Sequence, residues 1–261
     1  MNKIGLKLWN INTDYYYDEA LKLYNEKVFD YIELYIVPGH LDLIDKWDKI
    51  NIPFDIHAPH FAHNMNLSKK KYEKDNYIKY IEVKEYADRL NSKVIVFHGG
   101  ISGDYKETAR QLANFNDDRI VIENKPFQPL RMSKDNRCIG STYEELKYIM
   151  EVSGCGFCLD IGHAICSANS QNLEPYNYIK KLSTLDPKRI HLSDIETSSI
   201  YDQHLNYGNG NLDFEKVLKA LPSDINITIE TNKISKTDLN DYKNDVLFLK
   251  EILKYIKTEN I

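Results

Sequence analysis

Val94-Ile95-Val96-Phe97-His98 is a short run of β-branched and aromatic residues that ends in a histidine, and two glycines follow it. The next run of this kind, Arg119-Ile120-Val121-Ile122-Glu123, ends in a glutamate. A segment with helical periodicity separates the two runs. This alternation predicts a strand, a helix and a second strand parallel to the first.

The same pattern recurs along the whole chain of 261 residues. The eight runs are Lys3–Trp9, Tyr31–Ile36, Pro53–His57, Val94–His98, Arg119–Glu123, Gly156–Asp160, Arg189–Leu192 and Ile225–Glu230. Asp241–Lys257 predicts a closing helix. Largely apolar strands that are each followed by a helix indicate an all-parallel sheet covered by helices. We therefore predict an α/β fold in which residues 1–261 form one catalytic domain, a single (β/α)8 TIM barrel. A doubly wound sheet is the main alternative, but the turn Trp9-Asn10-Ile11-Asn12 lacks the glycines that such a sheet needs to bind a nucleotide.

Composition excludes several classes of protein. Hydrophobic residues make up 42% of the chain, charged residues 28%, and the formal net charge is −5. No apolar run approaches the roughly 18 residues of a membrane span, and the start of the chain lacks the apolar region of a signal peptide. The four cysteines cluster between Cys138 and Cys166, unlike a disulfide framework. These features predict a cytoplasmic protein with no membrane partner, and the acidic balance argues against nucleic acid as a general ligand.

Ionisable residues gather at or just after the carboxyl ends of six consecutive runs, where a barrel places its active site. The potential ligands are His57, His98, Glu123, Asp160, His163, His191, Asp202, His204 and Glu230. Carboxylates and imidazoles crowded in a partly desolvated cavity require cations to compensate them. Imidazole and carboxylate without thiolate suit Zn, Mn or Fe better than Mg or Ca. The set predicts two or three divalent ions, with zinc as the first choice and Glu123 as the bridging carboxylate.

Other residues near these strand ends have simpler interpretations. His60 lies just past His57, and we expect it to line the pocket with Trp9, Asn124 and Lys125 as substrate-binding residues.

Cys155 and Cys158 have CxxC spacing but no second pair, which favours core packing over zinc or redox chemistry. Gly208-Asn209-Gly210 predicts a tight turn rather than a phosphate loop. The pattern Ser141-Thr142-Tyr143-Glu144 predicts a capping box with Ser141 as the cap.

Seven motifs in order carry a resemblance that covers nearly the whole chain. They are His57-Ala58-Pro59-His60-Phe61, Phe97-His98-Gly99-Gly100, Glu123-Asn124, Cys158-Leu159-Asp160-Ile161-Gly162-His163, His191-Leu192-Ser193-Asp194, Asp202-Gln203-His204 and Ile229-Glu230-Thr231. The set resembles the endonuclease IV and xylose-isomerase-like TIM-barrel superfamily, also called AP endonuclease family 2. In the endonuclease branch the nine matching positions bind three zinc ions. The resemblance therefore implies a phosphoester or phosphodiester hydrolase, with abasic DNA as the substrate if the chain is a true endonuclease.

The same resemblance supports a second function. Sugar isomerases and epimerases of the superfamily hold one divalent ion at the positions of Glu123, Asp160, His191 and Glu230. In that case Glu123 and Glu230 would be the catalytic acid and base on a sugar or sugar phosphate. The short segment Val37-Pro38-Gly39-His40-Leu41 contains no arginine, whereas the endonucleases insert an Arg-bearing loop there, so a small phosphorylated or sugar substrate is expected. A third interpretation is a barrel that only binds a sugar or a metal. The sequence predicts no particular protein partner.

Overall fold

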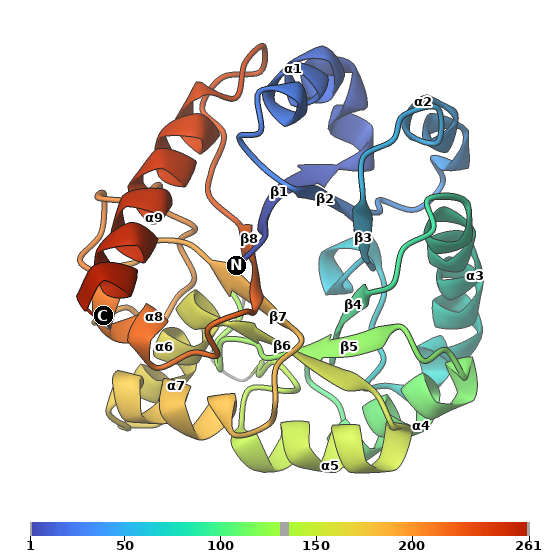
Figure 1. Ribbon diagram of the computed structural model, residues 1–261. Helices are drawn as coiled ribbons and strands as arrows, with labels where there is room; N and C mark the ends of the chain where they lie inside the picture. Colours follow the sequence, from blue (N-terminus) through green and yellow to red (C-terminus); the bar gives the residue numbers. More distant parts are fainter. Residues whose placement is uncertain (1, 131–135, 260–261) are drawn as a thin grey trace.

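The structure is a computed structural model that describes residues 2–130 and 136–259 (Figure 1). Its eight strands are β1 Ile4–Trp9, β2 Tyr31–Tyr35, β3 Phe54–His57, β4 Ile95–His98, β5 Ile120–Glu123, β6 Gly156–Asp160, β7 Arg189–Leu192 and β8 Asn226–Ile229. Each strand pairs in parallel with the next, and β8 pairs with β1, so the sheet closes in sequence order. The predicted TIM barrel is confirmed.

Helices surround this sheet in Figure 1. They are α1 Thr13–Asn25, α2 Ile44–Trp47, α3 Glu73–Arg89, α4 Tyr105–Phe115, α5 Tyr143–Ser153, α6 Ile161–Ser170, α7 Pro175–Ser183, α8 Phe214–Lys219 and α9 Asn240–Glu259. The predicted closing helix corresponds to α9. Within the described residues, no helix combines the length and the apolar character that crossing a membrane requires.

The two faces of each strand differ in chemistry because successive side chains point to opposite sides of a sheet. Ile4, Leu6 and Leu8 of β1 are buried in the large apolar cluster that joins strands to helices. The intervening Lys7 instead pairs with Glu33 of β2, its register partner across the sheet. Barrel interiors are usually filled by Val, Ile and Leu. Here a large share of the interior is polar and charged.

Helix α5 begins one residue later than the predicted capping box. Thr142, not Ser141, is its N-cap, and the Thr142 hydroxyl accepts a hydrogen bond from the Glu145 amide. Glu145 Oε2 then accepts from the amides of Gly140 and Ser141 at 3.0 and 3.3 Å. The prediction was wrong by one position because Thr142 and Glu145 have the same spacing as Ser141 and Glu144.

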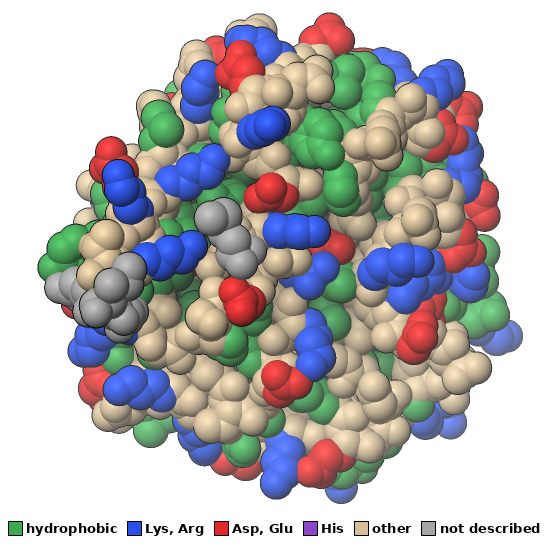
Figure 2. Space-filling model, in the orientation of Figure 1, with side chains coloured by type: hydrophobic (Ala, Val, Ile, Leu, Met, Phe, Trp, Pro, Cys, Tyr) green, Lys and Arg blue, Asp and Glu red, His purple; other side chains and the backbone are tan. Residues whose placement is uncertain are grey.

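Basic and acidic side chains are interspersed on the face of the molecule shown in Figure 2, and no histidine is visible there. Near the amino-terminal ends of the strands, Asp55 of β3 pairs with Arg189 of β7 inside the barrel. The carboxyl ends of the strands carry the predicted ligands instead.

Candidate metal centre

The predicted ligands converge at the carboxyl end of the barrel. Four groups of side chains each offer ligand atoms that all lie within 4.8 Å of one another. The groups are Glu33, His57, His191 and Glu230; His57, His98 and Glu123; His163, Asp202 and His204; and Glu123, Asp160 and His163. All nine predicted residues are present, and Glu33 is the one addition.

Glu123 lies at the centre of the cluster and faces ligands on two sides. Its Oε2 atom is 3.0 Å from His57 Nε2 and 2.9 Å from His98 Nε2. Its Oε1 atom is 2.8 Å from His163 Nδ1. The side chain is fully buried at the end of β5, where its register partner on β4 is His98. One carboxylate therefore faces two ligand groups, and its role as a bridge between ions stays a prediction.

Another group combines His163 of α6 with Asp202 and His204 from the loop that follows β7. Asp202 Oδ2 lies 3.1 Å from His163 Nε2 and 2.7 Å from His204 Nε2. His204 has a φ of 49°, in the left-handed region that non-glycine residues rarely adopt. Its Nδ1 atom donates to the carbonyl of Glu230 at 2.7 Å. Backbone strain of this kind persists where the surrounding structure fixes the residue, and it is frequent at functional sites.

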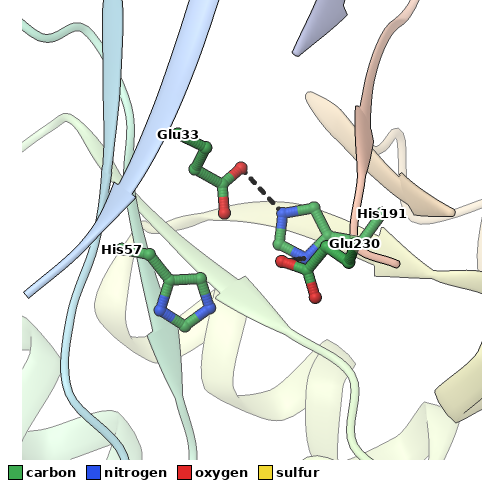
Figure 3. Close-up of side chains that lie close together, drawn as sticks. All are labelled: Glu33, His57, His191 and Glu230. Atoms are coloured by element: carbon green, nitrogen blue, oxygen red, sulfur yellow. Dashed lines mark hydrogen bonds and ion pairs between the residues drawn. The ribbon is translucent and has the colours of Figure 1, made fainter. Parts of the chain in front are cut away.

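Glu33 was missed by the sequence analysis because it stands in the middle of β2 rather than at its end. Its Oε2 atom accepts from His191 Nε2 at 2.9 Å, and its Oε1 atom accepts from Lys7 at 2.6 Å. Figure 3 shows Glu33 and His57 projecting from neighbouring strands toward His191 and Glu230. Lys7, also missed, forms a second ion pair with Glu230. The available signal was a single charged residue in the middle of each of two otherwise uncharged stretches, 4–9 and 31–35.

The chemistry of the donors fits divalent ions. A carbonyl or ionised carboxylate can only accept, so the contacts with Ala58 and Glu33 fix His57 Nδ1 and His191 Nε2 as the protonated nitrogens. In a neutral ring the other nitrogen carries the lone pair, and in both residues that nitrogen faces a carboxylate. His98 Nδ1, His191 Nδ1 and Asp202 Oδ1 are buried without a hydrogen-bond partner among the described residues. Buried polar atoms are normally satisfied, and cations would satisfy His191 Nδ1 and Asp202 Oδ1.

The electrostatic environment couples these groups strongly. Burial raises the pKa of Asp160 to about 6, and the Glu123 and Asp202 carboxylates act in the same direction. Burial lowers the pKa of His204, but the Asp202 carboxylate outweighs burial and raises it to about 9. Burial also opposes ionisation of Glu123, yet His98 and Lys125 hold its pKa well below the usual value. Shifted groups in one cleft mark a functional site.

A cavity of about 600 Å³ opens beside the cluster. Three of the four residues predicted to bind substrate, Trp9, His60 and Lys125, line it. Asn124 does not; its side chain instead brackets the backbone of Asp160, donating to the carbonyl at 2.8 Å and accepting from the amide at 2.7 Å. Asp160 caps α6 by accepting from the His163 amide. Asn124 thus positions the residue where β6 ends and α6 begins.

Two further motifs have structural roles. The amides of Gly208 and Gly210 donate to Asp194 Oδ2 at 2.8 and 2.9 Å, so this turn surrounds a carboxylate of the protein itself. A Cβ on Gly210 would lie 2.6 Å from Asp194 Oδ1, so a residue with a side chain would collide with that carboxylate.

Cys158 is fully buried, Cys155 is half-buried, and both are free thiols, in agreement with a packing role.

Comparison with known proteins identifies the family. The profile of the Xylose isomerase-like TIM barrel family matches residues 29–252. The chain belongs to this family. An uncharacterised protein of Methanocaldococcus jannaschii is 24% identical to this family member over 94% of the chain and 96% of its own length.

Solved structures with the same fold include an epimerase-like protein and an endonuclease. A D-tagatose 3-epimerase-like protein is 21% identical, with a TM-score of 0.73 over 99% of this chain and 100% of its own. Endonuclease IV of Thermus thermophilus is 17% identical, with a TM-score of 0.67 over 97% of this chain and 99% of its own. The same fold therefore occurs in both kinds of protein, and the fold alone does not choose between their activities.

Proposed function

We propose that this family member is a divalent-metal-dependent hydrolase of phosphoester bonds with a multinuclear site. The observation that carries the proposal is the position of Glu123, whose two oxygens face different ligand groups. One group, His57, His98 and Glu123, shares no residue with another, His163, Asp202 and His204. A single ion does not need so many ligands, whereas two or three ions would use them all. Zinc suits these donors best, with Mn or Fe as alternatives.

Bound ions would activate water and neutralise the charge on the phosphate oxygens. Hydrolysis forms a bond between the water oxygen and phosphorus, breaks the P–O bond to the leaving group, and transfers a proton to the leaving oxygen. The protein would hold the ligands rigidly through contacts behind them, such as that of Asn124 with Asp160 and of Glu33 with His191. No side-chain nucleophile is required.

A small substrate fits this proposal better than duplex DNA. The segment after β2 is short and folds back onto α3, because the amides of Gly39 and His40 donate to Glu82 at 2.9 and 3.1 Å. It carries no arginine between residues 37 and 41. DNA binding depends on neutralising several phosphates, and the formal net charge of −5 does not favour it.

One arrangement favours sugar isomerisation or epimerisation as a second candidate. Glu123 Oε2 and Glu230 Oε1 lie 3.5 and 3.1 Å from the same atom, His191 Nδ1. Two carboxylates so placed would exchange protons with a carbon next to a carbonyl group. In that function one ion would be held by Glu123, Asp160, His191 and Glu230.

The test is a paired assay on zinc-loaded protein with the ions counted by elemental analysis. Substrates are bis(p-nitrophenyl) phosphate, an oligonucleotide with an abasic site, and a panel of ketoses and sugar phosphates. We expect P–O cleavage, more than one ion per chain, and loss of activity on chelation and in Glu123→Gln. Epimerised or isomerised sugar with a single ion per chain would overturn the hydrolase in favour of the second candidate.

A further inference from the structure

Lys233 is a lysine of the cavity wall without a carboxylate partner. It lies three residues past the predicted ligand Glu230, in the segment that joins β8 to α9, and is half-buried. Its Nζ atom donates to the Thr231 carbonyl at 3.3 Å. Among the described residues it forms no ion pair, whereas Lys7 contacts Glu33 and Glu230, and Lys125 contacts Glu123. A half-buried lysine of the cavity wall that forms no ion pair leaves its ammonium group available to an anionic ligand.

The total charge of the centre points in the same direction. Five carboxylates, Glu33, Glu123, Asp160, Asp202 and Glu230, surround the cluster, and the three lysines named above accompany them. The five carboxylates exceed the three lysines by two negative charges, whereas two divalent ions carry four positive charges. The centre with two ions bound would therefore have a net positive charge. The loaded cavity would therefore favour a negatively charged substrate over a neutral one.

The cavity also offers an aromatic surface next to its charged end. The Trp9 ring stacks on Tyr35 with centroids 4.8 Å apart, and 36% of Trp9 remains exposed. Both residues line the cavity, as does Tyr15. A stacked aromatic ring that stays partly exposed provides a platform for the ring of a ligand.

We infer that Lys233 is a specificity-determining residue that binds the phosphate of a small, ring-containing substrate. The inference rests on the proposed function in one respect, that the cavity beside the metal centre is where the substrate binds. A sugar phosphate and a nucleotide share this chemistry, and the Trp9 platform separates them because only a nucleobase would stack on it extensively.

The experiment measures binding rather than turnover. Zinc-loaded protein is titrated calorimetrically with ribose 5-phosphate, ribose and AMP, using the wild type, Lys233→Met and Lys233→Arg. Lys74→Met, which removes an exposed lysine of α3 outside the cavity, is the matched control. Thermal melts confirm that each variant is folded.

We expect Lys233→Met to weaken ribose 5-phosphate binding about tenfold, as for the loss of one charge-assisted hydrogen bond. Ribose binding should not change, Lys233→Arg should retain most of the affinity, and Lys74→Met should match the wild type. Phosphate contacts with the ions are common to all variants and cancel in these ratios. Tighter binding of AMP that is lost in Trp9→Ala would identify a nucleotide, and equal binding of both phosphates a sugar phosphate.

Two results would overturn the inference. One is a wild type that binds ribose and ribose 5-phosphate equally well, and the other is a Lys233→Met variant that retains the full preference for the phosphate. Neither depends on catalysis, so a failure of the hydrolase proposal, seen in the activity assay, would be distinguished from a failure here.

Discussion

Single side chains behind the ligands determine how the ligands are presented. Glu33 is completely buried and accepts hydrogen bonds from His191 Nε2 and from the Thr228 hydroxyl, at 2.9 and 2.8 Å. It fixes the ring orientation and the protonated nitrogen of His191, which leaves Nδ1 to face the Glu230 and Glu123 carboxylates. Partners of this kind tune metal sites nearly as strongly as the ligands themselves.

Glu33→Gln should keep the shape of this contact but remove its charge, and the amide can present its NH2 group to His191. We expect zinc affinity to fall about 10- to 100-fold, measured by competition with a chromophoric chelator. Glu85→Gln, on the exposed surface of α3, is the control and should leave affinity unchanged. Unaltered zinc binding in Glu33→Gln would show that Glu33 does not orient His191.

At the residue scale, the sequence predicted which candidate ligands come together but not the groups that lie behind them. Strand ends are recognisable, and a barrel places them all at one rim, so residues as distant as His57 and Glu230 were assigned together. Glu33 and Lys7 lie inside strands, where one charge in an apolar run also fits a solvated face. Only the register, which pairs Lys7 with Glu33 across β1 and β2, shows that both point into the barrel.

At the element scale, the starts of helices α5 and α6 tie the site to the scaffold. Helix α6 begins directly after β6, so Asp160 is both the N-cap and a predicted ligand. Helix α5 starts with Thr142, whose neighbours Gly140 and Ser141 are held by Glu145. The sequence did not predict α6, and the capping pattern around residue 142 placed the start of α5 one position too early.

Thr142→Ala should destabilise the protein by about 1 kcal/mol because the amide of Glu145 loses its side-chain acceptor. Thr142→Ser retains a hydroxyl and should restore most of the loss. Urea denaturation of the two variants beside the wild type measures the difference. A Thr142→Ala variant as stable as the wild type would mean that the cap contributes nothing in solution.

At the scale of the whole molecule, polar contacts run through the inside of the barrel from one end to the other. Asp55 and Arg189 pair near the amino-terminal ends of the strands. Above them, Tyr31 contacts Thr228 at 2.9 Å, and Thr228 donates to Glu33. The apolar character of the runs predicted the outer, helix-facing layer correctly, but it gave no indication that the interior would be polar.

Arg189→Met should destabilise the barrel by about 3 kcal/mol because it leaves the Asp55 carboxylate, 4% exposed, without its partner. Adding Asp55→Asn should recover part of that loss, since no buried charge remains. Zinc binding should stay close to that of the wild type in the double variant, because the pair lies near the amino-terminal end of the barrel. Equal unfolding free energies for the single and double variants would argue against this explanation.

The central claim is that side chains from six consecutive strand ends and the loops after them surround more than one divalent ion. A crystal structure of the zinc-loaded protein with anomalous data at the zinc edge tests it most directly. We predict separate anomalous peaks, one between His57, His98 and Glu123 and one between His163, Asp202 and His204. A single peak held by Glu123, Asp160, His191 and Glu230, or zinc bound away from these residues, would contradict the claim.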